Sequence, residues 1–191
     1  MNKNTQQANL YNISVSYKKA DAVVRGKFSL TKEAQIELLK DAKTSGVEGI
    51  FVLSTCNRTE ITGFAEHPFQ LIKLLCKYSN GSVEEFAQVS NVYKNQEAIT
   101  HLFRMGTGLD SQILGDYEIV GQLRQAFKHA KEHKTTNAYF ERLLNHVMQA
   151  SKRVKNETRL SSGTTSVSYA AVQYIIRNLS NYNAKNMLVF G

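Results

Sequence analysis

The sequence predicts an α+β protein, and three observations support this class. Strand-like segments cluster before residue 94, where helical patterns separate them. These segments follow the order strand, helix, strand, strand, helix, strand. After Tyr93 the pattern becomes mainly helical. The order of elements before residue 94 is that of a ferredoxin-like βαββαβ sandwich. We therefore expect this sandwich with added helices, followed by a long connecting helix.

The first predicted strand is 10–17, LYNISVSY, because apolar and polar residues alternate along it. The first predicted helix is 31–46, which carries a helical stripe of apolar residues. We expect Thr31 to cap its N-terminus and Gly46 to end it. A strand and then a helix therefore open the fold.

Two further strands are predicted on either side of a polar connection. The apolar run 49–54, GIFVLS, predicts one strand, and the alternating run 59–65, TEITGFA, predicts the next. The connection between them carries Cys56. We therefore expect Cys56 to lie on a turn.

The remaining segments complete the sandwich and add a helical layer. The run 68–81 predicts a helix that begins at Pro68 and ends before Gly81, and FAQVSNVY at 86–93 predicts the fourth strand. Further helices are predicted at 95–108, at 110–133 with an irregularity near Gly115, at 137–158, and, after the linker-like run 160–165, at 166–179.

The chain ends in KNMLVFG, an apolar run that reaches a glycine. Such a run is how a dinucleotide-binding domain begins. We therefore expect four parts: 1–94 as the ferredoxin-like part of the first domain, 95–158 as its helical part, 159–184 as a connecting helix, and 185–191 as the start of a dinucleotide-binding domain.

Composition excludes several classes of protein. The chain has 191 residues, of which 42% are hydrophobic, so it can bury a substantial core. Its two cysteines form no disulfide framework, and no Cys/His cluster has zinc-ligand spacing, so we expect no metal site. The N-terminus is too polar for a signal peptide, and no apolar run reaches membrane-spanning length. We expect a soluble protein of the reducing cytoplasm.

The formal net charge is +8, and the excess is local. Arg124, Lys128 and Lys131 recur at i, i+4 and i+7, which places them along one helix face. Such a stripe suits a phosphate backbone, as in a nucleic acid. A solvated helix face is the alternative.

Cys56 stands where an apolar run gives way to polar residues, in the motif STCNRTE. A working thiol needs groups that stabilise its thiolate, whereas a structural cysteine prefers apolar neighbours. Cys56 is therefore a candidate nucleophile, with a packed cysteine at a strand end as the alternative. Cys76 lies amid LIKLLCKY and is expected in the core.

With STCNRTE at 54–60 and HLFRMGTGLDSQILGDYEIVGQLRQAF at 101–127, the chain resembles the N-terminal part of the glutamyl-tRNA reductase family. The resemblance runs from about Leu10 to Gly191. It includes SKRVKNET and SVSYAAV, which are similar to the family's long connecting, or spinal, helix. It implies that the first two predicted parts form a catalytic domain.

The resemblance implies an oxidoreductase of tetrapyrrole (porphyrin and heme) biosynthesis. In this family a cysteine forms a thioester with the glutamyl group of glutamyl-tRNA, which NADPH then reduces to glutamate-1-semialdehyde. Cys56 falls at the position of the nucleophile. His101 falls at a position important for activity, where an imidazole can accept a proton or polarise a carbonyl. Its alternative is a helix histidine packed beside Leu102 and Met105.

Substrate-binding positions follow from the same resemblance. Arg58 is expected to bind the side-chain carboxylate of the glutamyl group through two hydrogen bonds, with an ion pair to Glu60 as the alternative. The other implied substrate-binding residues are Thr55, Asn57, Ser111, Asp116, Tyr117, Glu118 and Gln122.

The chain departs from the family pattern at two places. Asp116 replaces the usual glutamate, Tyr117 stands where proline is frequent, and Glu118 replaces the common glutamine. The segment SVSYKKADAVVRGKF stands where the family usually has Asn-His-Lys-Thr-Ala-Pro before an arginine, and it retains only Lys18 and Arg25.

The resemblance also implies a cofactor and partners. NADPH is expected in the full-length enzyme, with Gly191 as the first glycine of its phosphate loop and the rest of that domain outside this chain. We accordingly expect acylation by this chain but no reduction. The expected partners are glutamyl-tRNA, a second copy bound through a C-terminal region outside this chain, and glutamate-1-semialdehyde aminotransferase.

Two other functions stay open. One is a non-catalytic tRNA-binding or regulatory module on the same scaffold, which the departures at Tyr17, Asp116 and Glu118 favour. The other is a thiol hydrolase of acyl esters.

Overall fold

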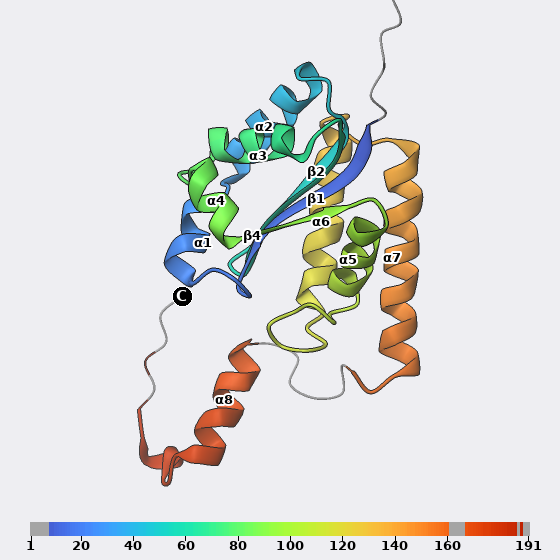
Figure 1. The fold of residues 1–191 in the computed structure, drawn as a ribbon. Helices are drawn as coiled ribbons and strands as arrows, with labels where there is room; N and C mark the ends of the chain where they lie inside the picture. Colours follow the sequence, from blue (N-terminus) through green and yellow to red (C-terminus); the bar gives the residue numbers. More distant parts are fainter. Residues whose placement is uncertain (1–7, 161–166, 187, 189–191) are drawn as a thin grey trace, which may run out of the picture.

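A four-stranded antiparallel sheet lies between two layers of helices (Figure 1). The computed structural model describes residues 8–160, 167–186 and 188. The sheet order is β2-β3-β1-β4, with every neighbouring pair antiparallel. The strands are β1 (Asn9–Ser16), β2 (Glu48–Ser54), β3 (Arg58–Ala65) and β4 (Ser90–Lys94). This order is that of a ferredoxin-like sandwich, and it confirms the predicted fold class.

One layer consists of four helices that follow β1 and β3 in the chain. They are α1 (Ala22–Phe28), α2 (Lys32–Thr44), α3 (Pro68–Tyr78) and α4 (Val83–Val89). Their apolar sides meet one face of the sheet in a core that includes Ile13, Leu38, Leu75 and Phe86. The Thr31 hydroxyl accepts the Ala34 N–H and caps α2, as the sequence predicted.

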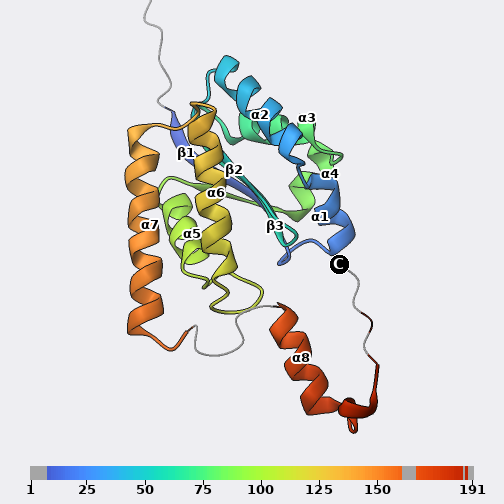
Figure 2. The same cartoon turned by 180° about the vertical axis from the view of Figure 1, so that it is seen from behind.

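The other layer is formed by three helices from the second half of the chain. They are α5 (Gln96–Gly106), α6 (Glu118–Glu132) and α7 (Ala138–Glu157), and Figure 2 shows them from behind. Their core includes Leu102, Leu123 and Phe140. The rings of Phe51 on β2 and Phe140 meet edge to face, with centroids 5.3 Å apart.

The two faces of β1 differ in chemistry, because successive side chains of a strand point to opposite sides. Ile13 and Val15 enter the core under α1 to α4. Asn12, Ser14 and Ser16 point to the opposite face and are nevertheless buried. The sheet therefore presents a buried polar strip on the side that α5 covers.

Two local predictions were wrong. The predicted strand 86–93 begins only at Ser90, because Ser82 and Glu85 form a capping box that starts α4 at Val83. The predicted helix 110–133 begins only at Glu118. Gly108 and Gly115 have φ values of +76° and +82°, which end α5 in an irregular loop, 107–117.

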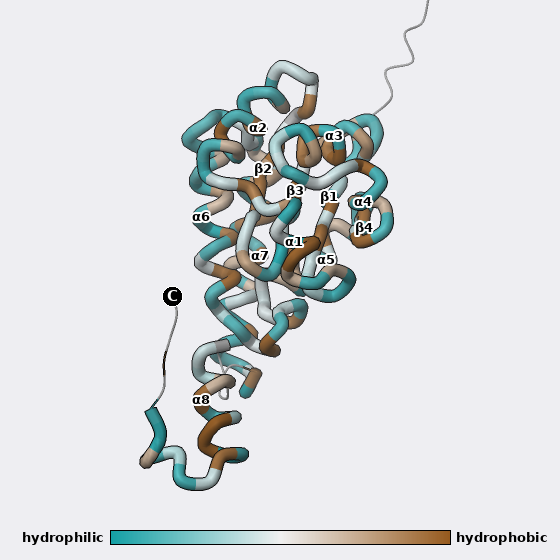
Figure 3. Tube along the Cα trace, turned by 90° about the vertical axis from the view of Figure 1, so that its left-hand side faces the viewer, coloured by the Kyte–Doolittle hydropathy of each residue, from teal (hydrophilic) through white to brown (hydrophobic). Residues whose placement is uncertain are grey.

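The predicted helix 166–179 is present as α8 (Val167–Asn178), within the part 159–184 predicted as a connecting helix. A 3-10 turn follows at Tyr182–Ala184. Figure 3 shows apolar segments along α8, where Tyr174 is 69% exposed. Residues 161–166, 187 and 189–191, and with them Gly191, lie outside the described residues. The division into four parts stays a prediction.

None of the helices in the described ranges combines the length and the apolar character that crossing a bilayer requires.

Candidate active site

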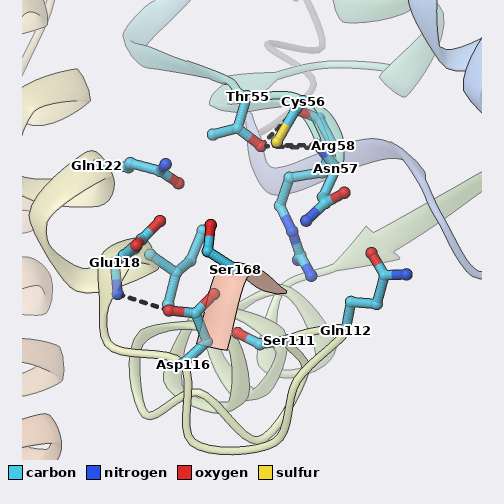
Figure 4. A pocket seen from close by; sticks show the side chains of 11 residues that line it. Thr55, Cys56, Asn57, Arg58, Ser111, Gln112, Asp116, Glu118, Gln122 and Ser168 are labelled. Atoms are coloured by element: carbon cyan, nitrogen blue, oxygen red, sulfur yellow. Dashed lines mark hydrogen bonds between the residues drawn. The ribbon is translucent and has the colours of Figure 1, made fainter. Parts of the chain in front are cut away.

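Cys56 lies at the tip of the turn between β2 and β3, with its side chain exposed (Figure 4). Thr55 closes this turn. Its backbone N–H donates to the Arg58 carbonyl at 2.8 Å, and its hydroxyl oxygen accepts the N–H groups of Asn57 and Arg58 at 3.3 and 3.2 Å. The Arg25 guanidinium donates to the Cys56 carbonyl at 3.3 Å. The thiol is therefore presented to solvent from a fixed backbone.

A hollow of about 160 Å³ opens beside the thiol. We call it the acyl pocket. Three segments that are far apart in the sequence form it: the β2–β3 turn, the loop 107–117 with the start of α6, and the start of α8. Its lining residues are Thr55, Cys56, Asn57, Arg58, Ser111, Gln112, Asp116, Glu118, Ile119, Gln122 and Ser168.

Arg58 lines the acyl pocket, and Glu60 and Asp110 hold its guanidinium. Its side chain is only 2% exposed. Nη1 lies 2.9 Å from Oε1 of Glu60 and 3.5 Å from Oδ2 of Asp110, and Nη2 donates to the Asp110 carbonyl. The ion pair with Glu60 is thus present, and Arg58 lines the pocket at the same time.

Glu60 is the centre of the buried polar strip and is 1% exposed. Besides Arg58, its carboxylate accepts hydrogen bonds from Asn12 at 3.0 Å and Ser14 at 3.1 Å, and it pairs with Nε2 of His101 at 2.9 Å. Burial alone would raise its pKa, but the charge and hydrogen bond of His101, the charge of Arg58 and the bond from Asn12 lower the pKa to about 2. Glu60 is therefore a fixed anion.

The opposite wall of the acyl pocket is acidic. Asp116 and Glu118 lie on it, and Oδ1 of Asp116 accepts the backbone N–H of Glu118 at 2.9 Å. The pocket therefore has a guanidinium on one side and two carboxylates on the other. This arrangement suits a small ligand that carries both an anionic and a cationic group.

Comparison with known proteins identifies the family. The model of the glutamyl-tRNAGlu reductase N-terminal domain matches residues 13–158. The chain belongs to this family.

Relatives extend this match along almost the whole chain. It is 60% identical over 181 residues to glutamyl-tRNA reductase 2 of Flavobacterium johnsoniae, and 61% identical to the glutamyl-tRNA reductase of Christiangramia forsetii. Each alignment covers 95% of this chain but only 42% and 43% of the relative. The glutamyl-tRNA reductase structure from Methanopyrus kandleri matches with a TM-score of 0.69 at 26% identity, over 89% of this chain and 40% of that one.

Within this glutamyl-tRNA reductase domain, the structure brings most of the predicted site residues together. Thr55, Cys56, Asn57 and Arg58 meet Ser111, Asp116, Glu118 and Gln122 around one pocket. Loop 107–117 carries Ser111 and Asp116 to the pocket. Its course requires a glycine at position 115, because a Cβ there would overlap the Leu160 carbonyl. Three further lining residues, Gln112, Ile119 and Ser168, were not predicted. Ser168 follows the predicted linker, and no sequence signal placed it near Cys56.

Two predicted residues lie elsewhere. His101 does not line the acyl pocket but lies behind Arg58, 6% exposed, with its ring stacked on Tyr93 at 4.3 Å. Tyr117 lies between α6 and α7, where its hydroxyl donates to the Ser151 carbonyl at 3.4 Å. The reasons differ: His101 is on α5, which contributes no lining residue to the acyl pocket, whereas Tyr117 stands between Asp116 and Glu118 but its side chain turns toward α7.

Glu60 was predicted only as an alternative partner for Arg58. A signal for the pair was available, because the two residues are two apart at the start of the predicted strand, and residues i and i+2 of a strand point to the same face. A charged residue that is buried there needs a partner.

The second cysteine has a different environment. Cys76 is half-buried and packs against the core under α1 to α4. Burial raises its pKa, and the charges of Glu84 and Glu85 raise it further.

No group of three or more His, Cys, Asp or Glu side chains in the described part of the chain is placed to hold a metal ion.

Proposed function

We propose that this chain carries the acyl-transfer site of a glutamyl-tRNA reductase. The observation that carries the proposal is the exposed thiol of Cys56 beside a pocket whose guanidinium is held rigidly by Glu60 and Asp110. An ester is an activated acyl donor, and a thiolate is a strong nucleophile near neutral pH.

The proposed reaction is transfer of the glutamyl group from tRNA to sulfur. The Cys56 thiol loses its proton to solvent, and the thiolate attacks the ester carbon. The new bond joins sulfur to carbon, the carbon–oxygen bond to the ribose breaks, and the departing 3′-oxygen takes a proton from water. The product is a glutamyl thioester on Cys56 and free tRNA.

Each wall of the acyl pocket has a role in this proposal. The glutamyl group carries a side-chain carboxylate, which the Arg58 guanidinium would bind, and an α-ammonium group, which Asp116 and Glu118 would bind. Asp116 keeps the negative charge of the glutamate that is usual in the family, and Glu118 adds a second one, so both would favour binding of the α-ammonium group. Ser111 and Gln122 supply neutral hydrogen-bonding groups between the charged walls.

His101 acts in this proposal as a positioning residue. It lies on the far side of Glu60 from the pocket, so it cannot reach the ester while the network is closed. His101 contacts Oε2 of Glu60, which leaves Oε1 of the same carboxylate for Arg58. His101 thereby fixes the Glu60 carboxylate, and the carboxylate fixes the Arg58 guanidinium.

Reduction belongs to the whole enzyme in this proposal. Conversion of the thioester to glutamate-1-semialdehyde takes a hydride from NADPH. In the described residues no strand leads through a glycine-rich turn to a helix N-terminus that could hold a pyrophosphate. The described residues therefore supply no site for the NADPH pyrophosphate, and the reaction proposed for this domain ends at the thioester. A homodimer, the aminotransferase partner and a cytoplasmic location rest on the family resemblance.

The test uses radiolabelled glutamyl-tRNA with the chain and with two variants, Cys56→Ser and Cys76→Ser. We expect label on the wild-type protein and on Cys76→Ser, but not on Cys56→Ser, followed by slow release of glutamate without NADPH. Equal glutamate release by all three proteins would exclude Cys56 as the nucleophile. Binding of tRNA without label on any of them would favour a non-catalytic tRNA-binding module instead.

A further inference from the structure

A second hollow, of about 400 Å³, lies on the other side of the thiol from the acyl pocket. We call it the exit pocket. It is formed by α2, the end of β2 and α6, and it shares Thr55, Cys56 and Gln122 with the acyl pocket. Its other lining residues are Lys32, Gln35, Val52, Leu53, Ser54, Gln125, Ala126 and His129.

The two pockets differ in charge. The acyl pocket includes the carboxylates of Asp116 and Glu118, whereas the residues that line the exit pocket include no acid. The exit pocket has Lys32 at its rim instead. A polyanion that approaches Cys56 is therefore repelled on one side and attracted on the other.

The lining of the exit pocket combines apolar residues with amide groups. The apolar residues are Val52, Leu53 and Ala126. Gln35 donates to the Leu30 carbonyl at 3.1 Å, which fixes its amide. Within the part of the chain that the structure describes, the side chains of Gln122 and Gln125 make no hydrogen bond to protein. Their donors and acceptors are available to a ligand.

A planar nucleobase fits this combination. Glutamine amides pair with the hydrogen-bonding edge of adenine, and an imidazole ring can stack on a base. Burial, and then the neighbouring His133, lower the pKa of His129. Its ring is therefore neutral near pH 7 and suited to stacking.

The geometry of ester cleavage indicates which part of the substrate each pocket binds. The reacting carbon joins an acyl chain on one side to the leaving oxygen on the other, so the two groups point away from each other at Cys56. Because Arg58 draws the glutamyl carboxylate into the acyl pocket, the leaving group must lie on the opposite side. We infer that the exit pocket binds the terminal adenosine of the acylated tRNA, with Lys32 near its phosphate. This inference rests on the proposed acyl transfer.

The test compares two acyl donors with the same glutamyl group. One is glutamyl-tRNA, and the other is the α-ethyl thioester of glutamate, which has no nucleoside. Acylation of Cys56 is followed by intact mass in the wild type, in Lys32→Ala/Gln125→Ala, and in Lys73→Ala/Gln88→Ala. The last variant is matched in residue type, and its exposed positions on α3 and α4 line neither pocket.

We expect the exit-pocket variant to lose about tenfold or more in its acylation rate with glutamyl-tRNA, and to react with the thioester at the wild-type rate. The control variant should match the wild type with both donors. An equal loss with both donors, or no loss with either, would overturn the inference.

A second measurement separates this inference from the proposed function. Iodoacetamide alkylation of Cys56 is timed with uncharged tRNA and with the same tRNA lacking its terminal adenosine. We expect stronger protection by the complete tRNA, and equal protection by both would overturn the exit pocket. If neither donor acylates Cys56 while adenosine-dependent protection persists, the acyl transfer fails and the nucleoside site stands.

Discussion

Nη1 of Arg58 lies 2.9 Å from Oε1 of Glu60, two residues further along the same strand, and both side chains are buried. Residues i and i+2 of a strand point to the same face, so the pair is built into β3. Asp110 approaches Arg58 from loop 107–117, and His101 approaches Glu60 from α5. The network therefore ties the sheet, the loop and the helix to the guanidinium that faces Cys56.

Replacing Glu60 by Gln should lower stability and change its dependence on pH. The folded-state pKa of about 2 lies below the ordinary value of 4.5, so the carboxylate stabilises the fold above about pH 4.5. This contribution is lost as the pH falls toward 2, and at neutral pH it amounts to about 3 kcal/mol. The measurement is the free energy of unfolding by urea between pH 2 and pH 7.

The expected result is a curve for Glu60→Gln that is lower at pH 7 and flatter between pH 4.5 and 2 than that of the wild type. Glu37→Gln is the matched control, because Glu37 pairs with Lys40 on an exposed helix surface. A wild-type slope in Glu60→Gln would show that other groups set the acid sensitivity.

Arg58→Lys should separate charge from shape at the acyl pocket. Lysine keeps the cation but loses the planar fork that holds Glu60 and Asp110 while it faces the pocket. We expect acylation of Cys56 by glutamyl-tRNA to fall by about 100-fold, as for the loss of a charged hydrogen-bonded pair. Arg25→Lys, at the backbone side of the turn, serves as the comparison.

Acylation of Arg58→Lys at the wild-type rate would exclude the carboxylate-binding role. Thermal unfolding of the variant is measured in parallel. Loss of cooperativity there would trace the effect to the network rather than to the substrate.

The two cysteines should differ in reactivity. Cys56 is exposed on a turn, whereas burial and two nearby glutamates raise the pKa of Cys76. Iodoacetamide at pH 7.5 should therefore modify Cys56 first, by about tenfold or more in rate. Peptide mapping by mass spectrometry reports both sites, and faster labelling of Cys76 would contradict the assignment.

The sequence predicted the elements whose signals are local. Thr31 and Pro68 start helices where expected, and the order of strands led to the correct sheet. An irregularity near Gly115 was predicted, but the extent of loop 107–117 was not, because its course depends on close packing of Gly115 against Leu160, which is 45 residues further along the chain.

In the candidate site, too, features with a local sequence signal were predictable and features that depend on distant contacts were not. The turn at Cys56 was predictable, since an apolar run ends there in polar residues. The position of His101 was not, because Glu60 and Tyr93 draw its ring away from the thiol, and these are contacts between segments distant in the chain. Side-chain networks of this kind have no sequence period.

Two of the three residues in the predicted basic stripe are paired with carboxylates. Lys128 and Lys131 each have a carboxylate partner, Glu132 at 3.9 Å and Glu141 at 2.9 Å. Arg124, the third residue of the stripe, lines a groove between α6 and α7 together with Lys152 and Lys155, and these three have no acidic partner among the described residues. The Lys155 ammonium lies 5.3 Å from the centre of the Tyr117 ring.

Charge reversal in this groove should weaken tRNA binding with a defined dependence on salt. Each phosphate contact releases counterions, so Lys152→Glu/Lys155→Glu should reduce the slope of log K against log salt by about two. The control is Lys128→Glu/Lys131→Glu, which makes the same change of net charge where each lysine is already paired, and which should alter the slope less. Binding is measured by fluorescence anisotropy at several salt concentrations. Equal slopes for the two double variants would mean that net charge, not the groove, attracts tRNA, and an unchanged slope in both would make the groove a solvated surface.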